Sequence, residues 1–283
     1  MGTATNDMQI SEHELAAMTR DLDELHHASL ASFRDALSRY SEAIHTMMAR
    51  TVEPAHGEAT RRSFLRGGLI TAGAVGGGAV LAACGSSTTT TSSITGASPT
   101  PSADLDFVRL GASLEVLAVA AYGTALTVAT SGALGTVPPA LAAFVTTAKE
   151  QHGEHEAAWN GILTKNRQPE QTAPDPALSA PVQAQLKAVT GIPALATLAL
   201  GLENVALQTY VNGAGLLQSA DARLVALTIA PVEAQHAAIL NYLLGQYPVP
   251  DSQIPKDKAR VPGDLTATPE PSLMTSPTAP ASA

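Results

Sequence analysis

The sequence is poor in cysteine and in basic charge, and each shortage excludes a class of protein. Its 283 residues include a single cysteine, so no disulfide, thiolate zinc site or iron–sulfur cluster can form within one chain. The formal net charge is −9 at pH 7. Because binding to phosphate groups requires a basic patch, nucleic acid is not expected as a partner.

The sequence also lacks runs of alternating β-branched residues bounded by turns, which argues against a β-sheet. Residues 104–247 form the one segment able to build a sizeable core. They are rich in Ala, Leu and Val with few aromatic residues, a composition that suits closely packed helices. Residues 85–103 and 248–283 are rich in Ser, Thr and Pro, and we expect a disordered or extended linker and tail there. The expected fold class is therefore all-α.

Residues 1–59 form an N-terminal extension whose apolar residues recur at spacings of three and four, which predicts an amphipathic helix over residues 11–50. Ser11 followed by Glu14 resembles a capping box at its start. Two interpretations of this extension are open. We favour the first, in which it is either removed together with an export signal or added by a start codon assigned too far upstream. In the second, it is a cytoplasmic helix that pairs with itself or with a chaperone before export. None of its histidines is expected to be a ligand: His13, His26, His27, His45 and His56.

Residues 60–84 resemble a bacterial export signal. The paired Arg61 and Arg62, followed by Ser-Phe-Leu-Arg, resemble the twin-arginine signal, and a run of small and apolar residues follows. The run closes with Leu-Ala-Ala-Cys-Gly, which resembles a lipoprotein cleavage box with Cys84 as the acylated residue. The resemblance implies contact with the twin-arginine export machinery and with the membrane through Cys84. It places the domain on the outer face of the bacterial cytoplasmic membrane.

Residues 104–247 contain an internal repeat. Segments 114–122 and 202–210 both read Leu-Glu-x-x-Ala-x-x-x-Tyr, and the segments that begin at His155 and His236 both read His-x-Ala-x-x-Asn. A helix with a Glu and a helix with a His therefore alternate along the chain. Two copies of such a hairpin predict a four-helix bundle with a two-fold pseudo-axis.

The connections expected between these helices fit the same arrangement. Residues 131–137 and 218–221 are short enough to join antiparallel neighbours, whereas residues 166–191 are long and rich in proline. We therefore expect an antiparallel four-helix bundle with one long crossover.

On the last of the four helices, Glu233 and His236 are three residues apart, so their side chains lie on one face and can reach the same ion. The whole of residues 104–247 resembles the ferritin-like proteins of the di-iron carboxylate type, in which two helices each give one Glu and two each give a Glu-x-x-His. This resemblance implies a di-metal centre of iron or manganese. The ligands that it implies are Glu115, His155, Glu203, Glu233 and His236.

The second helix departs from this pattern, because His152 stands three residues before His155, where the family has a carboxylate. Either His152 is itself a ligand, which makes the site more tolerant of zinc, copper or a single iron, or one metal position is weak or lost. The neighbouring acidic residues lie on other faces: Glu150, Glu154 and Glu156. The departure puts a ferroxidase-type activity in doubt but leaves the fold unaffected.

Glu115 and Glu203 lie in strongly apolar segments. Burying their carboxylates without compensation costs several kcal/mol each, so metal ions, imidazoles or retained protons must balance them. The alternative to a metal site is a vestigial polar core held by Glu–His and Glu–Tyr hydrogen bonds. Tyr122 and Tyr210, seven residues after the glutamates, either support the ligands or anchor a neighbouring helix through their hydroxyls.

Two functions of different class are consistent with these patterns. The first is an exported, lipid-anchored metalloprotein, with oxygen- or peroxide-linked redox or metal oxidation as its chemistry if it is an enzyme. The second is a non-catalytic structural or stress-protective envelope protein with a vestigial site. A ferritin cage is not expected for a tethered domain, whereas a homodimer stays open.

Overall fold

The computed structural model describes residues 10–52, 101–249 and 253–266. The predictions for Arg61, Arg62 and Cys84, and for most of the linker 85–103, lie outside these residues. In the part of the chain that the structure describes, every regular element is helical. The helices are α1 (Glu12–Val52), α3 (Pro101–Thr130), α4 (Pro139–Lys165), α5 (Pro176–Ala188), α6 (Ile192–Leu216), α7 (Ala220–Leu243) and the 3-10 helix η1 (Pro262–Thr266).

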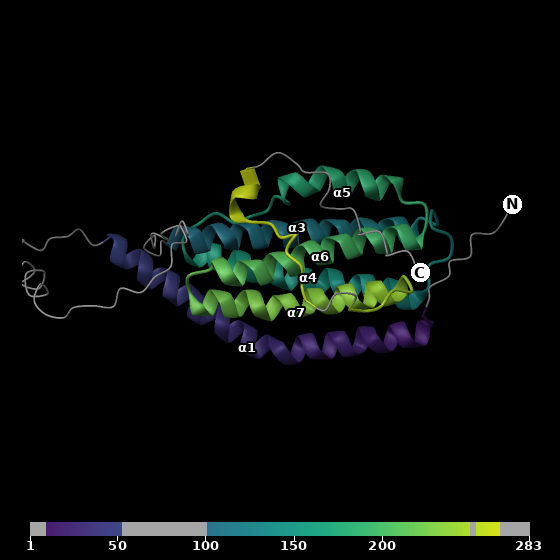
Figure 1. The fold of residues 1–283 in the computed structure, drawn as a ribbon, viewed down its shortest axis with the longest axis horizontal. Helices are drawn as coiled ribbons and strands as arrows, with labels where there is room; N and C mark the ends of the chain where they lie inside the picture. Colours follow the sequence, from purple (N-terminus) through teal and green to yellow (C-terminus); the bar gives the residue numbers. More distant parts are fainter. Residues whose placement is uncertain (1–9, 53–100, 250–252, 267–283) are drawn as a thin grey trace, which may run out of the picture. The chain divides into compact units, whose positions relative to one another are not determined.

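Helices α3, α4, α6 and α7 form the antiparallel four-helix bundle that the internal repeat predicts (Figure 1). The hairpins α3–α4 and α6–α7 are the two copies of the repeat. Short connections join the helices within each hairpin, and the long crossover between the hairpins holds α5. The expected fold class, an all-α bundle with one crossover, is confirmed.

Side chains at the helix ends fix these connections. The Asp175 carboxylate accepts hydrogen bonds from the Ala177 and Leu178 amides at 2.9 and 3.1 Å, and so caps α5. Asp104, at the start of α3, accepts from the Gln218 and Ser219 amides at 2.9 and 3.1 Å. These two hydrogen bonds to Asp104 tie the turn between α6 and α7 to the start of the first bundle helix.

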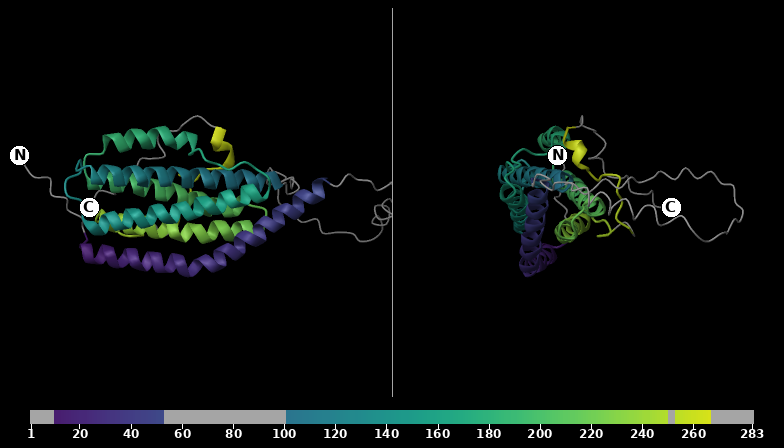
Figure 2. Two further views of the ribbon diagram at one scale, coloured as in Figure 1. Left: turned by 180° about the vertical axis from the view of Figure 1, so that it is seen from behind. Right: turned by 90° about the vertical axis from the view of Figure 1, so that its left-hand side faces the viewer.

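Helix α1 packs on the bundle, an arrangement that the sequence analysis did not anticipate. Ser11 and Glu14 form the predicted capping box, with the Ser11 amide 3.0 Å from Glu14 Oε2 and the Glu14 amide 3.2 Å from Ser11 Oγ. Leu15 and Leu22 are buried in one apolar cluster with residues of α4, α6 and α7, among them Phe144. Figure 2 shows α1 and α5 on opposite sides of the bundle.

The segment 253–266 also packs on the bundle, although the tail was expected to be disordered or extended. The Arg260 guanidinium is buried and lies 3.2 Å from both oxygens of Asp175. Its backbone amide donates to Thr209 Oγ1 at 2.9 Å, and the Lys258 amide donates to Gln208 Oε1 at 2.7 Å. Composition did not reveal this contact, because an ion pair between segments distant in sequence leaves no local pattern.

Two of the bundle helices, α3 and α7, are long and apolar enough by composition to cross a membrane. Both are central elements of the bundle, however, and both carry buried ionisable residues, Glu115 on α3 and Glu233 on α7. Their apolar character is therefore accounted for by packing within the domain.

Candidate metal centre

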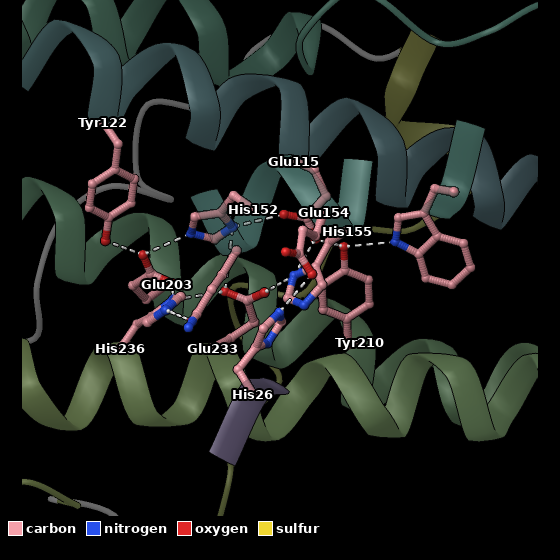
Figure 3. Close-up of polar contacts among 12 residues, drawn as sticks. His26, Glu115, Tyr122, His152, Glu154, His155, Glu203, Tyr210, Glu233 and His236 are labelled. Carbon is pink, nitrogen blue, oxygen red and sulfur yellow. Dashed lines mark hydrogen bonds and ion pairs between the residues drawn. The ribbon is translucent and has the colours of Figure 1, made fainter. Parts of the chain in front are cut away.

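The four bundle helices bring all six predicted ligands together in the core (Figure 3). Helices α3 and α6 each contribute one glutamate, α4 contributes two histidines, and α7 contributes the Glu-x-x-His pair. No side chain of the six is more than 2% exposed: Glu115, His152, His155, Glu203, Glu233 and His236.

The six side chains form two overlapping groups of four. The first group is Glu115, His152, His155 and Glu233, and the second is His152, Glu203, Glu233 and His236. Within each group, one ligand atom per residue lies within 4.8 Å of those of the other three. Donors on opposite sides of one metal ion are about 4.4 Å apart, so each group is close to the size of one coordination sphere.

His152 lies between the two groups, at the position where the family pattern has a carboxylate. Its Nδ1 is 2.8 Å from Glu115 Oε2, and its Nε2 is 3.2 Å from Glu203 Oε1. Each ring nitrogen therefore faces the lone glutamate of a different repeat. The substituted histidine therefore belongs to both groups of the candidate centre.

The two tyrosines cross between the repeats. The Tyr122 hydroxyl donates to Glu203, and the Tyr210 hydroxyl donates to Glu115. Trp159 extends the second contact, because its Nε1 donates to the Tyr210 oxygen at 3.2 Å. The two roles considered for the tyrosines are compatible. Each hydroxyl connects its own helix to a facing helix, and each also orients a predicted ligand.

The chain matches the ferritin-like domain family over residues 103–246, a range that contains nearly all of the four bundle helices. It belongs to the ferritin-like family. Comparison with curated proteins and with solved structures gave no match. Helix α1 and the segment 253–266 lie outside the matched range, so both are additions to the ferritin-like domain.

Charge in the ferritin-like core is balanced between carboxylates and imidazoles. Burial alone would lower the pKa of His152, but Glu233 and Glu203 outweigh it and raise that pKa well above its ordinary value. Burial likewise opposes a charged His236, yet chiefly Glu203 raises its pKa. Burial would raise the pKa of Glu203, whereas His152 and His236 hold it well below its ordinary value. Without metal, two imidazolium groups therefore compensate the carboxylates.

Glu233 and His155 are less well satisfied. Glu233 Oε2 lies 3.8 Å from His152 Nδ1 and 3.7 Å from His236 Nδ1, too far for hydrogen bonds. Burial raises the pKa of Glu233 and lowers the pKa of His155 to about 3. His155 Nδ1 lies 3.3 Å from Glu233 Oε1, but neither this nitrogen nor either Glu233 oxygen makes a hydrogen bond. A neutral imidazole with an unshared electron pair and a carboxylate with two free oxygens are metal ligands by chemistry. The residues present therefore fit a metal ion.

Gln151, which the sequence analysis missed, supports His236. Its Oε1 accepts a hydrogen bond from His236 Nε2 at 2.9 Å, while His236 Nδ1 faces Glu203 Oε2 at 3.2 Å. Metal-bound histidines commonly donate the other ring N–H to such an acceptor, which fixes the tautomer and the ring orientation. No spacing rule marks Gln151, since it precedes His152 directly and serves a histidine on another helix.

Proposed function

We propose that this ferritin-like protein binds two divalent metal ions in its core, one in each group, with the Glu233 carboxylate common to both and His152 lying between them. One observation carries the proposal: Glu233 and His155 are buried and face each other, and neither the two Glu233 oxygens nor His155 Nδ1 makes a hydrogen bond. An unpaired buried carboxylate costs several kcal/mol, and a bound cation would offset that cost.

The donor set is suited to iron or manganese, and its third imidazole also makes zinc or copper acceptable. Three carboxylates supply hard oxygen ligands, three imidazoles supply nitrogen, and no thiolate is present in either group. When bound, a pair of such ions supplies one-electron redox chemistry with oxygen or peroxide. The chain orients the ligands: Tyr122 and Tyr210 hold the lone glutamates, and Gln151 holds His236.

An apolar cavity next to the centre supports oxygen as the oxidant. It has a volume of about 40 Å³ and is lined by apolar residues together with the Tyr122 ring, whose hydroxyl donates to Glu203. The pocket is partly open to solvent, and its apolar lining favours small apolar molecules over ions. Dioxygen is such a molecule, so this space suits an oxygen-linked redox function.

The non-catalytic alternative has one observation in its favour. His152, once protonated, satisfies Glu115 and Glu203 at the same time and so stabilises the core without metal. A vestigial site of this kind leaves Glu233 and His155 unexplained. Metal content separates the two functions.

The test is elemental analysis of the full chain, purified without chelator and without a metal-affinity tag. We expect about two equivalents of iron or manganese. Glu233→Gln should lose both, because both groups share this carboxylate, and Glu150→Gln, an exposed glutamate of the same helix as His152, should retain both. A folded protein that binds neither iron, manganese nor added zinc would establish the non-catalytic function instead.

We further propose that the protein is exported in its folded state and anchored through Cys84. The support is the order of the paired arginines, the apolar run and the cysteine box in residues 60–84. Replacing Arg61 and Arg62 together by lysine should retain the protein in the cytoplasm, and Cys84→Ala should prevent lipid attachment. Cell fractionation and radiolabelled palmitate incorporation measure the two effects. Unchanged export and lipidation in these variants would refute the proposal.

A further inference from the structure

Helix α1 places a histidine beside the metal centre. Residues Thr19, His26, Phe33 and Tyr40 recur every seven residues and are all buried, so they lie on the face of α1 that packs against the domain. The position of His26 is one that an apolar residue would normally occupy. Its ring is 4% exposed, and its Nδ1 has no hydrogen-bond partner.

His26 joins the surface of the protein to one of the predicted ligands. Its Nε2 lies 3.2 Å from Glu154 Oε2, and its ring centroid lies 5.5 Å from that of His155 (Figure 3). The Glu154 side chain is 42% exposed, whereas His155 is completely buried. Solvent, Glu154, His26 and His155 therefore follow one another from the surface toward the core.

We propose that His26 and Glu154 form an outer binding station that takes a divalent cation from solvent and delivers it to His155. The inference rests on the proposed metal centre and adds its loading route. A carboxylate and an imidazole 3.2 Å apart have the chemistry and the spacing of two ligands on one ion. The partly exposed carboxylate attracts the cation, and the buried imidazole brings it within reach of the centre.

A simple docking contact is the competing explanation, and the interface argues against it. Leu15, Leu22 and their neighbours already bury the first part of α1, and Arg39 Nε pairs with Asp221 Oδ1 at 3.0 Å further along. A buried imidazole with an unpaired nitrogen costs stability relative to an apolar side chain at the same position. The contact at His26 therefore makes α1 dock less well than it could, which is consistent with a function for the imidazole.

The experiment follows the loading of metal-free full chain with Co²⁺. Trp159 is the single tryptophan and is linked through Tyr210 to Glu115, so quenching of its fluorescence reports the arrival of the ion. Stopped-flow rates are compared between the native chain, His26→Gln and Glu154→Gln. Arg39→Gln is the matched control, because it weakens α1 docking at a site remote from the station.

We expect His26→Gln and Glu154→Gln to load about tenfold more slowly, since local charge changes association rates by about 10- to 1000-fold. Both should reach the native Co²⁺ stoichiometry in equilibrium dialysis, and Arg39→Gln should load at the native rate or faster. If α1 only covers the centre, every variant that loosens α1 will load Co²⁺ faster than the native chain. Faster loading of His26→Gln and Glu154→Gln would therefore overturn the proposed binding station. Native-rate loading in both variants would overturn it too. A native chain that binds no Co²⁺, Fe²⁺ or Mn²⁺ would refute the metal centre and the station together.

Discussion

Glu233 and His155 face each other across 3.3 Å without a hydrogen bond, while His152 bonds to two glutamates at once. In the absence of metal, the imidazolium groups of His152 and His236 compensate two of the three buried carboxylates. The third carboxylate, Glu233, makes no hydrogen bond, and its nearest imidazole nitrogens lie 3.3 to 3.8 Å away. The metal-free core is therefore least well satisfied at Glu233, the carboxylate that both metal ions would share.

The first prediction concerns this third charge. Glu233→Gln keeps the shape of the side chain and removes its charge, so the metal-free protein should become more stable by about 1 kcal/mol or more, as buried ionic groups often cost stability. The same variant should no longer bind metal. Urea unfolding of metal-free samples measures the first effect, with Glu150→Gln as the exposed control. A less stable Glu233→Gln would show that the carboxylate is compensated within the protein.

The second prediction concerns pH. The pKa values of His152 and His236 are raised in the folded metal-free protein, so their protonation stabilises it fully below the unfolded pKa of about 6.5 and progressively less as pH rises through the folded values. Metal ions must displace these same protons, so the apparent metal affinity should rise with pH.

The difference in Tm between metal-loaded and metal-free protein should therefore grow as pH rises above about 6.5. His155 does not oppose this trend, because its pKa is lowered to about 3 and its linkage lies below this window. Differential scanning calorimetry at matched ionic strength measures the difference. A constant or shrinking difference would mean that the histidines are neutral before metal binds.

At the scale of helices, close approach between α3 and its neighbours depends on glycine. A Cβ on Gly213 of α6 would collide with the Phe107 ring of α3. Phe107 in turn packs edge-on against Trp159 and Tyr210, at centroid distances of 6.1 and 6.4 Å. Gly213 thus leaves room for Phe107, which packs against Tyr210, the residue whose hydroxyl donates to Glu115.

The third prediction follows from this contact. Gly213→Ala should destabilise the protein by about 1–3 kcal/mol, because Phe107 must move in a closely packed core. Gly215→Ala is the matched control: the same helix, nothing within 4 Å of the added Cβ, and an expected gain of about 0.5–1 kcal/mol from helix propensity. Urea unfolding at constant m-value compares them. Equal stability of the two variants would show that the interface can adjust without loss.

The sequence predicts a helix well when local residue patterns define it, and poorly when contacts with distant segments do. The repeat of Leu-Glu-x-x-Ala-x-x-x-Tyr and His-x-Ala-x-x-Asn predicted four helices and four of the six candidate ligands, because polar residues on apolar helices stand out locally. The three-residue spacings to His236 and His155 added Glu233 and His152. Helix α5 was missed within the proline-rich crossover, although Asp175 and Pro176 mark its start. Gln151 and the Arg260–Asp175 pair were missed because each acts on a partner distant in the sequence.

For the whole molecule, the main difference between the expected and the observed arrangement lies in residues 10–52, the described part of the N-terminal extension. The sequence predicted their helix and its capping box, but the extension was assigned to export processing, and His26 was read as an ordinary histidine. The structure groups residues 10–46 with the bundle in one compact unit. The seven-residue spacing of Thr19, His26, Phe33 and Tyr40 is consistent with one buried face of α1. The spacing does not identify the surface against which that face packs.

If Cys84 becomes the mature N-terminus, α1 is removed together with the export signal, and the outer station goes with it. Metal loading would then precede maturation, in agreement with an export route that carries folded proteins. The proposed loading step and the proposed export are thus linked through the position of α1 ahead of residues 60–84.

The central claim is that the six buried residues hold two metal ions, and anomalous diffraction tests it most directly. Crystals of the full chain loaded with iron or manganese would be measured at the absorption edge of the metal. We expect two peaks in the bundle core, each about 2.0–2.3 Å from its nearest ligand atoms, one beside Glu115 and His155 and the other beside Glu203 and His236. Absence of any peak in the core, or a single peak with His152 still bonded to both lone glutamates, would contradict the two-metal account.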